Sequence, residues 1–151
     1  MRISTKGRYA LRMMVDLAVH DSGNYISLRD VAERQEVSMK YMEQIVSLLT
    51  RGGFLYSVRG PQGGYRLARR PEEYTAGDIL RVTEGSLAPV SCIIEPGIKC
   101  PREDTCSTLD FWEGLHQSIS RYVDSVSLAD LVAVGQRKQA QKDQMGGKDD
   151  P

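Results

Sequence analysis

The stretch from Ser86 to Cys106 most limits how this chain can fold, because it shows neither a helical nor a strand period. It contains all of the cysteines together with residues that break regular structure: Cys92, Cys100, Cys106, Pro96, Gly97 and Pro101. A structureless loop of about 20 residues is uncommon inside a compact domain and usually signals disorder or function. Three thiols in such a loop suggest that something outside the chain holds it, between a folded part before it and another after it.

Composition places the chain among globular proteins of one ordinary domain. Of its 151 residues 40% are hydrophobic and 26% charged, and no apolar run approaches the length of a membrane span. The N-terminus lacks the apolar core of a signal peptide, so we expect a cytoplasmic protein with reduced thiols and no membrane partner. The net charge is zero, yet residues 1–75 carry +4 and residues 76–151 carry −4, which weakly favours DNA binding by the first half.

The first half predicts a winged helix-turn-helix within residues 1–85, in a mainly α fold with a small β-hairpin. Apolar residues at helical spacing predict a helix over 4–20, and Ser27 and Ser38 are typical caps of two further helices joined by a tight turn. Two strands around a glycine-rich turn, residues 59–64, predict the wing. A nucleotide-binding phosphate loop would require a helix directly after the glycines, whereas a strand follows.

Groove-reading residue types lie on the predicted exposed face of the third helix. Glutamate accepts a hydrogen bond from cytosine, glutamine bonds adenine bidentately and serine suits either base. Any soluble helix has a polar face, so the basic hairpin that follows, suited to backbone or minor-groove contact, strengthens the prediction. We predict DNA contacts from these residues: Arg8, Lys40, Tyr41, Glu43, Gln44, Ser47, Arg59 and Gln62.

The second half predicts helices after the cysteine loop. Thr75 and Asp78 first cap a helix over 76–84, and Ser107 with Asp110 predicts a capping box that opens a long helix. Apolar residues in that helix follow the a/d period of a coiled-coil seam: Trp112, Leu115, Ile119, Tyr122 and Val126. The helix either dimerises or packs as a core helix of its own chain. Residues 107–135 hold it and a short last helix, and residues 136–151 are predicted to be a disordered tail.

The thiol spacing, Cys92-x7-Cys100-x5-Cys106, does not match the paired spacing of structural zinc sites. Soft thiolates select zinc, copper(I) or iron–sulfur clusters, and an odd cysteine count argues against a disulfide framework. Three reduced thiols without a ligand remain the plain alternative.

Three segments resemble the Rrf2 family of bacterial winged-helix transcription regulators, and above all the iron–sulfur cluster regulators of that family. The segments are residues 1–10, 38–44 and 57–65. The resemblance covers about residues 1–134. It implies a non-enzymatic homodimer, mainly a repressor, on near-palindromic double-stranded DNA, with Glu43 and Arg59 contributing to recognition. It also implies an iron–sulfur cluster, 2Fe-2S rather than 4Fe-4S, held by Cys92, Cys100 and Cys106.

The resemblance leaves the fourth ligand open. Family cluster regulators have a histidine three residues after the third cysteine, where this chain has Leu109. A nitric-oxide-sensing branch uses a carboxylate at the position of Arg8. We expect a weak oxygen ligand from nearby carboxylates or a small exogenous ligand, and an exposed, non-ligating His116; the carboxylates are Glu95, Glu103, Asp104 and Asp110.

Three other functions stay open: a nitric-oxide-sensing repressor, a cluster-free repressor of cysteine metabolism acting with a partner protein, and a thiol enzyme or electron carrier. The last would need neither a wing nor a recognition helix.

Overall fold

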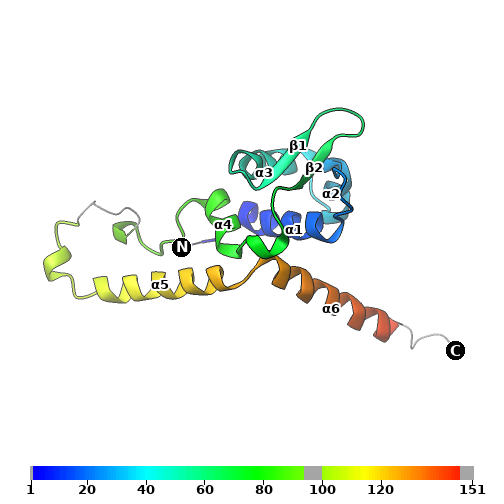
Figure 1. Ribbon diagram of the computed structural model, residues 1–151. Coiled ribbons are helices and arrows are strands. Elements are labelled where there is room, and N and C mark those ends of the chain that lie inside the picture. Colours follow the sequence, from blue (N-terminus) through cyan, green and yellow to red (C-terminus); the bar gives the residue numbers. More distant parts are fainter. Residues whose placement is uncertain (1, 94–99, 147–151) are drawn as a thin grey trace.

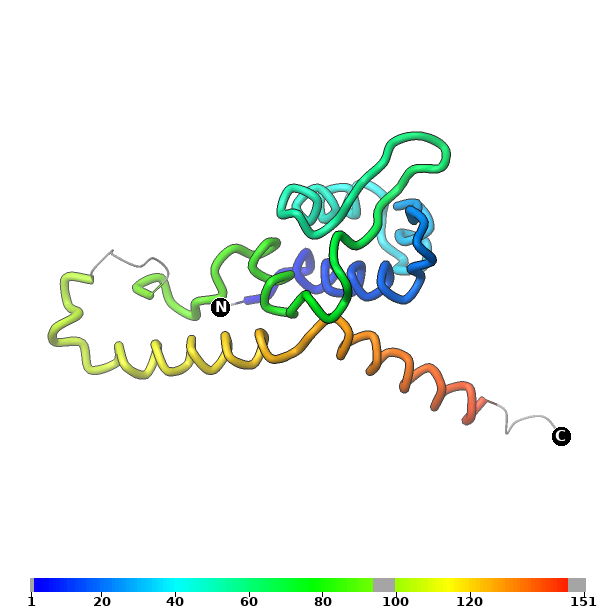
Figure 2. The backbone as a smooth tube through the Cα atoms, viewed as in Figure 1, coloured from blue at the N-terminus to red at the C-terminus, as the bar shows by residue number. Residues whose placement is uncertain are grey.

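The structure, a computed structural model, describes residues 2–93 and 100–146, and shows a compact body from which two helices extend (Figures 1 and 2). It is mainly helical with one two-stranded antiparallel hairpin, which confirms the predicted fold class. The elements are α1 (Thr5–Val19), α2 (Leu28–Gln35), α3 (Met39–Arg51), β1 (Leu55–Val58), β2 (Gly64–Leu67), α4 (Ala76–Glu84), α5 (Leu109–Ser125) and α6 (Leu128–Gly146). Among these residues, no helix combines the length and the apolar character needed to cross a membrane.

The first three helices surround the core and form the helix-turn-helix. The Ser27 hydroxyl accepts the Asp30 N–H at 3.2 Å, and the Ser38 hydroxyl accepts the Tyr41 N–H at 3.2 Å, as the predicted caps require. The turn between α2 and α3 contains no glycine, and Glu36 takes the left-handed conformation instead, with φ 56°. Apolar side chains from all three helices are fully buried: Met13, Met14, Leu17, Val31, Met42, Ile45 and Leu49.

The wing is fastened at its base to the segment that precedes α2. β1 pairs with β2 in the register Leu55 to Leu67, and Tyr65 exchanges two backbone hydrogen bonds of 2.8 Å with Ile26. A Cβ at Gly64 would collide with the Ile26 carbonyl, so this close approach requires glycine. The second strand is therefore held on both edges, by β1 and by Ile26, while the turn of residues 59–63 projects beyond the paired residues (Figure 1).

Tyr74 joins the wing to the rest of the molecule from a fully buried position. Its hydroxyl donates to the Phe54 carbonyl at 2.7 Å and accepts the Arg69 N–H at 2.9 Å. Its own carbonyl accepts the Leu128 N–H at 2.9 Å, and the Ala76 N–H donates to the Val126 carbonyl at 2.8 Å. The junction of α5 and α6 is thereby attached to the segment between the wing and α4.

The long helix α5 extends away from the body rather than lying in a core (Figure 1). None of its residues, all of which the structure describes, is buried, so the core-helix alternative is wrong. The expected capping box is also wrong: α5 begins at Leu109 with Thr108 as its cap residue, and the described residues show no side-chain capping bond there.

The predicted disordered tail is wrong for residues 136–146, which continue α6 as a helix. Alanine, glutamine, lysine and arginine have high helix propensity, so this segment extends the helix without an apolar face. Residues 147–151 lie outside the described residues. The Ser127 and Asp130 capping box that begins α6 is present, with bonds of 2.8 and 3.0 Å.

Candidate DNA-binding and cysteine-loop sites

The outer face of α3 presents four of the predicted DNA-contacting side chains to solvent. Met42, Ile45, Val46 and Leu49 anchor the opposite face in the core. The helix period therefore turns outward a polar row: Lys40, Glu43, Gln44 and Ser47. Because the buried face holds α3 rigidly, this row forms a fixed surface of donors and acceptors.

The wing tip places Arg59 and Gln62 in solvent beyond the hairpin. Its turn is closed by the Gly63 N–H, which donates to the Gly60 carbonyl at 2.9 Å, and Gly60 has φ 109°. Near the base, the Arg66 guanidinium stacks over the Tyr25 ring at 5.4 Å and donates to the Gly23 carbonyl at 3.3 Å. Arg66 is thus engaged within the protein, which leaves Arg59 as a cation at the tip.

Tyr41 and the two arginines of α1 differ in their exposure and in their contacts within the protein. The Tyr41 ring packs edge-on against Tyr9 at 6.0 Å and is half-buried, so it supports α3 as well as bordering its outer face. Arg12 donates to the Gln35 side chain and carbonyl and stacks over Tyr9. Arg8 is exposed in the first turn of α1 and is a cation of that helix suited to a phosphate.

A buried carboxylate that the sequence analysis missed holds α1 against α2. Asp16 is 5% exposed and accepts Arg34 Nη2 at 2.6 Å and Nε at 3.0 Å, as well as Gln35 Nε2 at 2.9 Å. His20 Nδ1 lies 3.6 Å from the same carboxylate. The hydrogen bond to Asp16 raises the pKa of Arg34. The partners are 4 to 19 residues away from Asp16, so no short motif signals this cluster.

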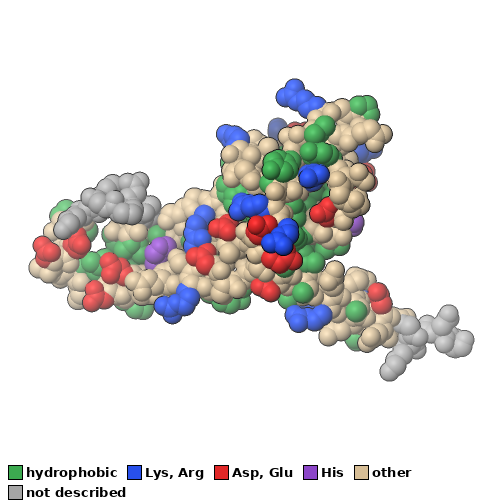
Figure 3. Space-filling view, viewed as in Figure 1, with side chains coloured by type: hydrophobic (Ala, Val, Ile, Leu, Met, Phe, Trp, Pro, Cys, Tyr) green, Lys and Arg blue, Asp and Glu red, His purple; other side chains and the backbone are tan. Residues whose placement is uncertain are grey.

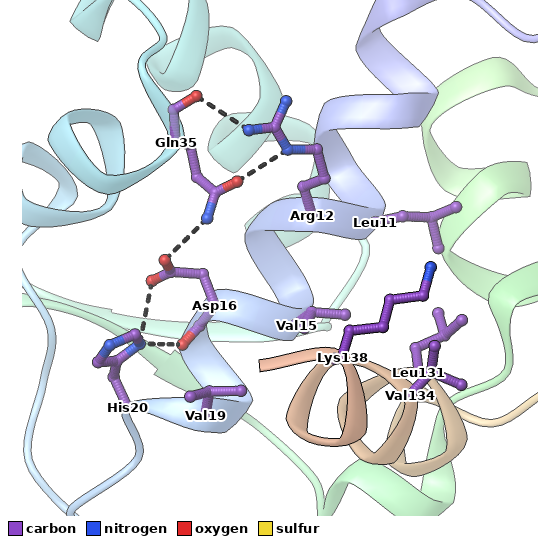
Figure 4. Close-up of a pocket in the computed structure, with 11 residues that line it drawn as sticks. Leu11, Arg12, Val15, Asp16, Val19, His20, Gln35, Leu131, Val134 and Lys138 are labelled. Carbon is purple, nitrogen blue, oxygen red and sulfur yellow. Dashed lines mark hydrogen bonds and ion pairs between the residues drawn. The ribbon is translucent and has the colours of Figure 1, made fainter. Parts of the chain in front are cut away.

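Beside this cluster, α1 and α6 border an open apolar groove of about 470 Å³ (Figure 4). Aliphatic side chains line it from both helices: Leu11, Val15, Val19, Leu131 and Val134. Lys138 lies at its rim (Figure 4). The contact between α1 and α6 is therefore incompletely filled.

Charge is unevenly distributed over the molecule. On the face shown in Figure 3, Asp and Glu side chains gather where α5 begins, whereas Lys and Arg side chains project around α3 and the wing. This agrees with the opposite net charges of the two halves of the sequence.

All three cysteines are free thiols; Cys92 is exposed, and Cys100 and Cys106 are partly exposed. Hydrogen bonds from Thr108, then from the Leu109 N–H, together with the nearby Arg102 charge, lower the pKa of the Cys106 thiol. Thiolate is the form that binds soft metals. Within residues 2–93 and 100–146, however, no three Cys, His, Asp or Glu side chains are gathered as in a metal site.

The candidates for a fourth ligand are placed differently than expected. Asp110 is exposed in the first turn of α5, and the capping task assigned to it is absent among the described residues. His116 is half-buried instead of exposed, and its Nδ1 is shielded from solvent without a hydrogen-bond partner in the described part of the chain. Glu103 and Asp104 form a 3₁₀ turn with Thr105, and Glu95 lies outside the described residues.

The predicted seam of α5 divides into two sides. Trp112 and Ile119 are half-buried, whereas Leu115 and Tyr122 are 37% and 70% exposed. Phe111, which the heptad pattern missed, is 63% exposed beside them. The open apolar stripe is thus Phe111, Leu115 and Tyr122. In the sequence, the aromatic Phe111 beside the predicted seam residue Trp112 is the feature that could have indicated this stripe.

Comparison with known proteins agrees with this architecture. The sequence model of the Rrf2 family, described as iron-dependent transcriptional regulators, matches residues 3–134. Protein rrf2 of Nitratidesulfovibrio vulgaris is 36% identical over 132 residues, or 87% of each chain. The HTH-type transcriptional regulator IscR of Aliivibrio salmonicida is 37% identical over 132 residues, which cover 87% of this chain and 77% of that one.

Two solved structures are similar to the whole fold. T. potens IscR is 38% identical with a TM-score of 0.72, over 92% of this chain and 91% of that one. CymR, the global cysteine regulator of B. subtilis, is 36% identical with a TM-score of 0.71, over 89% of this chain and 98% of that one. Since the family model spans most of the chain and the winged helix-turn-helix is present, the protein belongs to the Rrf2 family of transcription regulators.

Proposed function

We propose that this protein is a cytoplasmic homodimeric repressor that reads near-palindromic DNA and holds an iron–sulfur cluster in its cysteine loop. The supporting observation is one arrangement: a polar α3 face and a basic wing in the first half, an open helix α5 in the second, and three free thiols in the chain segment that connects them. In this proposal α3 enters the major groove and Arg59 contacts the backbone or minor groove.

The open stripe of α5 supports the homodimer. Phe111, Leu115 and Tyr122 expose apolar surface along one side of α5, while its other side approaches α4. Exposed apolar stripes of this kind mark interaction surfaces. A second copy of the same helix offers a matching stripe, and two-fold pairing would present two α3 helices to a near-palindromic operator.

The path of the cysteine loop supports a regulatory role for the segment that links α4 to α5. α4 and α5 are joined near the C-terminal end of α5 by Arg81 and Asp124, yet the chain enters α5 at Leu109. The loop must therefore span the length of α5, about 25 Å at 1.5 Å per residue. In this proposal, a cluster that gathers the thiols constrains the segment that joins the two halves.

The donor set fits an iron–sulfur cluster in its chemistry. Cys92, Cys100 and Cys106 would hold it, and the lowered pKa of Cys106 favours the thiolate that ligation requires. A bound cluster would supply redox-active iron held by these thiolates, with a reduction potential set by the cluster type and its surroundings. In this proposal the fourth position falls to an oxygen ligand or a small exogenous one, and the described carboxylates nearest in sequence to the thiols are Glu103, Asp104 and Asp110.

Purification without oxygen tests this proposal. The protein should show visible absorption, and Cys92→Ala, Cys100→Ala or Cys106→Ala should each abolish it, while His116→Ala leaves it unchanged. A colourless protein with stoichiometric free thiols after reconstitution with iron and sulfide would contradict the cluster. Loss of colour in His116→Ala, with circular dichroism unchanged, would make His116 the fourth ligand.

A cluster-free regulator is the second candidate, and two observations favour it. The described thiols are not gathered, and the fold resembles CymR as closely as IscR. In that case DNA affinity should be the same with and without iron and sulfide, and should respond to a partner protein instead.

A further inference from the structure

Helix α4 ends on a carboxylate that is bound by the first turn of another helix. Glu84 Oε1 accepts the Ser4 N–H at 3.0 Å, the Ser4 hydroxyl at 2.6 Å and the Gly7 N–H at 2.9 Å. These donors belong to the N-terminal end of α1, where backbone N–H groups lack partners within the helix and the helix dipole favours an anion. Glu84 therefore caps α1 from 77 to 80 residues away.

The fit around this carboxylate is tight enough to exclude a methyl group. A Cβ at Gly7 would collide with Glu84 Oε1 and come within 3.1 Å of Glu84 Cδ. The Ser4 side chain makes no capping bond to α1 among the described residues, and its hydroxyl donates to Glu84 instead. The sequence around Ser4 and Gly7 thus serves the contact with α4.

The opposite attachment of α4 is to α5. Arg81 Nη1 donates to Asp124 Oδ1 at 2.6 Å and Nη2 to Oδ2 at 3.0 Å. A Cβ at Gly77 would collide with the same Asp124 carboxylate, so α4 and α5 approach closely there. One nine-residue helix is therefore fastened to the scaffold of the DNA-binding unit by Glu84 and to α5 by Arg81.

The cysteine loop begins directly behind this attachment. Gly85 follows Glu84 with φ 78°, a conformation that favours glycine, and the chain then runs toward Cys92. Displacement of the loop is thus applied to the end of α4 that carries Glu84. Since α1 packs against α3 in the core, movement of α1 displaces the recognition helix.

We propose that Glu84 is a positioning residue through which the cysteine loop sets α1, and with it α3, relative to α5. The regulatory part of this inference rests on the proposed function. Without the Glu84 contact the loop still binds what its thiols bind, and α3 still contacts DNA, but the two events become independent.

The experiment compares DNA affinity of reconstituted and apo protein for Glu84→Gln, Gly7→Ala and the wild type. The probe is a duplex selected by the wild type from a randomised pool, and visible absorption reports loading. Gly7→Ala expels the carboxylate from the other side while raising the helix propensity of α1, so loss of response there is not caused by a weakened helix. Glu33→Gln is the control, because Glu33 pairs with Arg29 on the exposed surface of α2 alone.

The wild type and Glu33→Gln should show an affinity ratio of at least about fivefold between the two forms, as is typical of allosteric coupling. Glu84→Gln and Gly7→Ala should load normally, keep their circular dichroism and bring the ratio close to one. The same ratio in wild type and both variants overturns the role of Glu84 alone. No response in a loaded wild type overturns the cluster-sensing function and this inference together.

Discussion

Glu43 and Arg59 offer different chemistry to DNA, although both are exposed on the same half of the molecule. A carboxylate is repelled by phosphates and binds only where a base edge donates a hydrogen bond. A guanidinium binds any phosphate and gains counterion release. The identity of a single side chain therefore decides whether it contributes specificity or affinity.

Glu43→Ala should relax base preference at one operator position, where a base-edge contact is worth about 1–3 kcal/mol. Arg59→Ala should weaken binding to all sequences and lower the salt dependence by about one unit of slope. Binding isotherms on duplexes with single base changes, at several salt concentrations, measure both, with Glu113→Ala on α5 as the control. Equal loss on every duplex for Glu43→Ala would remove it as a base reader.

Tyr74→Phe should lower the free energy of unfolding by about 1 kcal/mol. The Arg69 N–H loses its bond to the Tyr74 hydroxyl, while the Phe54 carbonyl keeps only the bond from the Ala68 N–H, at 3.1 Å. Urea unfolding followed by circular dichroism gives the value. Tyr56→Phe, at a 53% exposed position of the wing, serves as the control and should change stability by less than about 0.5 kcal/mol. A similar loss in both variants would show that the hydroxyl network of Tyr74 carries no special role.

Among the elements, α4 and α5 are joined by an ion pair that water reaches from both sides. The side chains of Arg81 and Asp124 are 38% and 44% exposed, so solvent screens their attraction and their contribution stays within about 1 kcal/mol. Hydrogen bonding from Arg81 lowers the pKa of Asp124, and the pair raises the pKa of Arg81. The stabilisation that this ion pair provides between α4 and α5 should consequently decrease at low pH, where Asp124 becomes protonated.

The pKa of Asp124 is lower in the folded protein than in the unfolded chain, where it is about 3.9. The ion pair therefore stabilises the fold fully at pH values above the unfolded pKa, and this stabilisation is lost as the pH falls through the folded pKa. Asp124→Asn should thus lower stability by up to about 1 kcal/mol at pH 7, and its difference from wild type should vanish at the acid end of the titration. Urea unfolding at pH 7, 5 and 3 checks this, with Asp143→Asn on α6 as the control. A difference that persists undiminished at pH 3 would assign the effect to packing at Gly77.

At the scale of the whole molecule, α5 lacks a counterpart within its own described chain for one apolar side. Its other side carries Val123, which packs against α4 at Gly77. A Cβ added at Gly77 would lie only 3.0 Å from a Val123 methyl group. The helix is thus half supported by its own chain, and a second copy supplies the remaining contact in the proposed dimer. Ile119 lies on the supported side and is a less selective probe of dimerisation than the sequence suggested.

Tyr122→Asp and Leu115→Asp should convert a dimer into a monomer with intact helicity, because each places an unpaired charge in the interface at a cost of several kcal/mol. Light scattering at micromolar concentration measures the mass, and Gln117→Asp, on the opposite side of α5, should remain dimeric. A monomeric wild type at that concentration would contradict the dimer and the near-palindromic operator together.

Features that depend on residues close together in the sequence were predictable from it. The caps at Ser27, Ser38, Thr75 and Ser127, the buried stripe of α3 and the hairpin follow from local hydrogen bonds and the helix and strand periods. The failures were also local in origin: the pattern at Ser107 resembles a capping box that does not form, and a polar tail without periodicity still forms a helix through its propensity.

The sequence alone determined the element order, the cysteine loop and the exposed face of α3, since these depend on local periodicity. The tertiary structure decided which side of α5 stays open, that Asp16 joins α1 to α2, and that Glu84 caps α1. Those contacts bring together groups 18 to 80 residues apart. Their free energy depends on packing that no short segment contains, so it becomes visible only when the chain has folded.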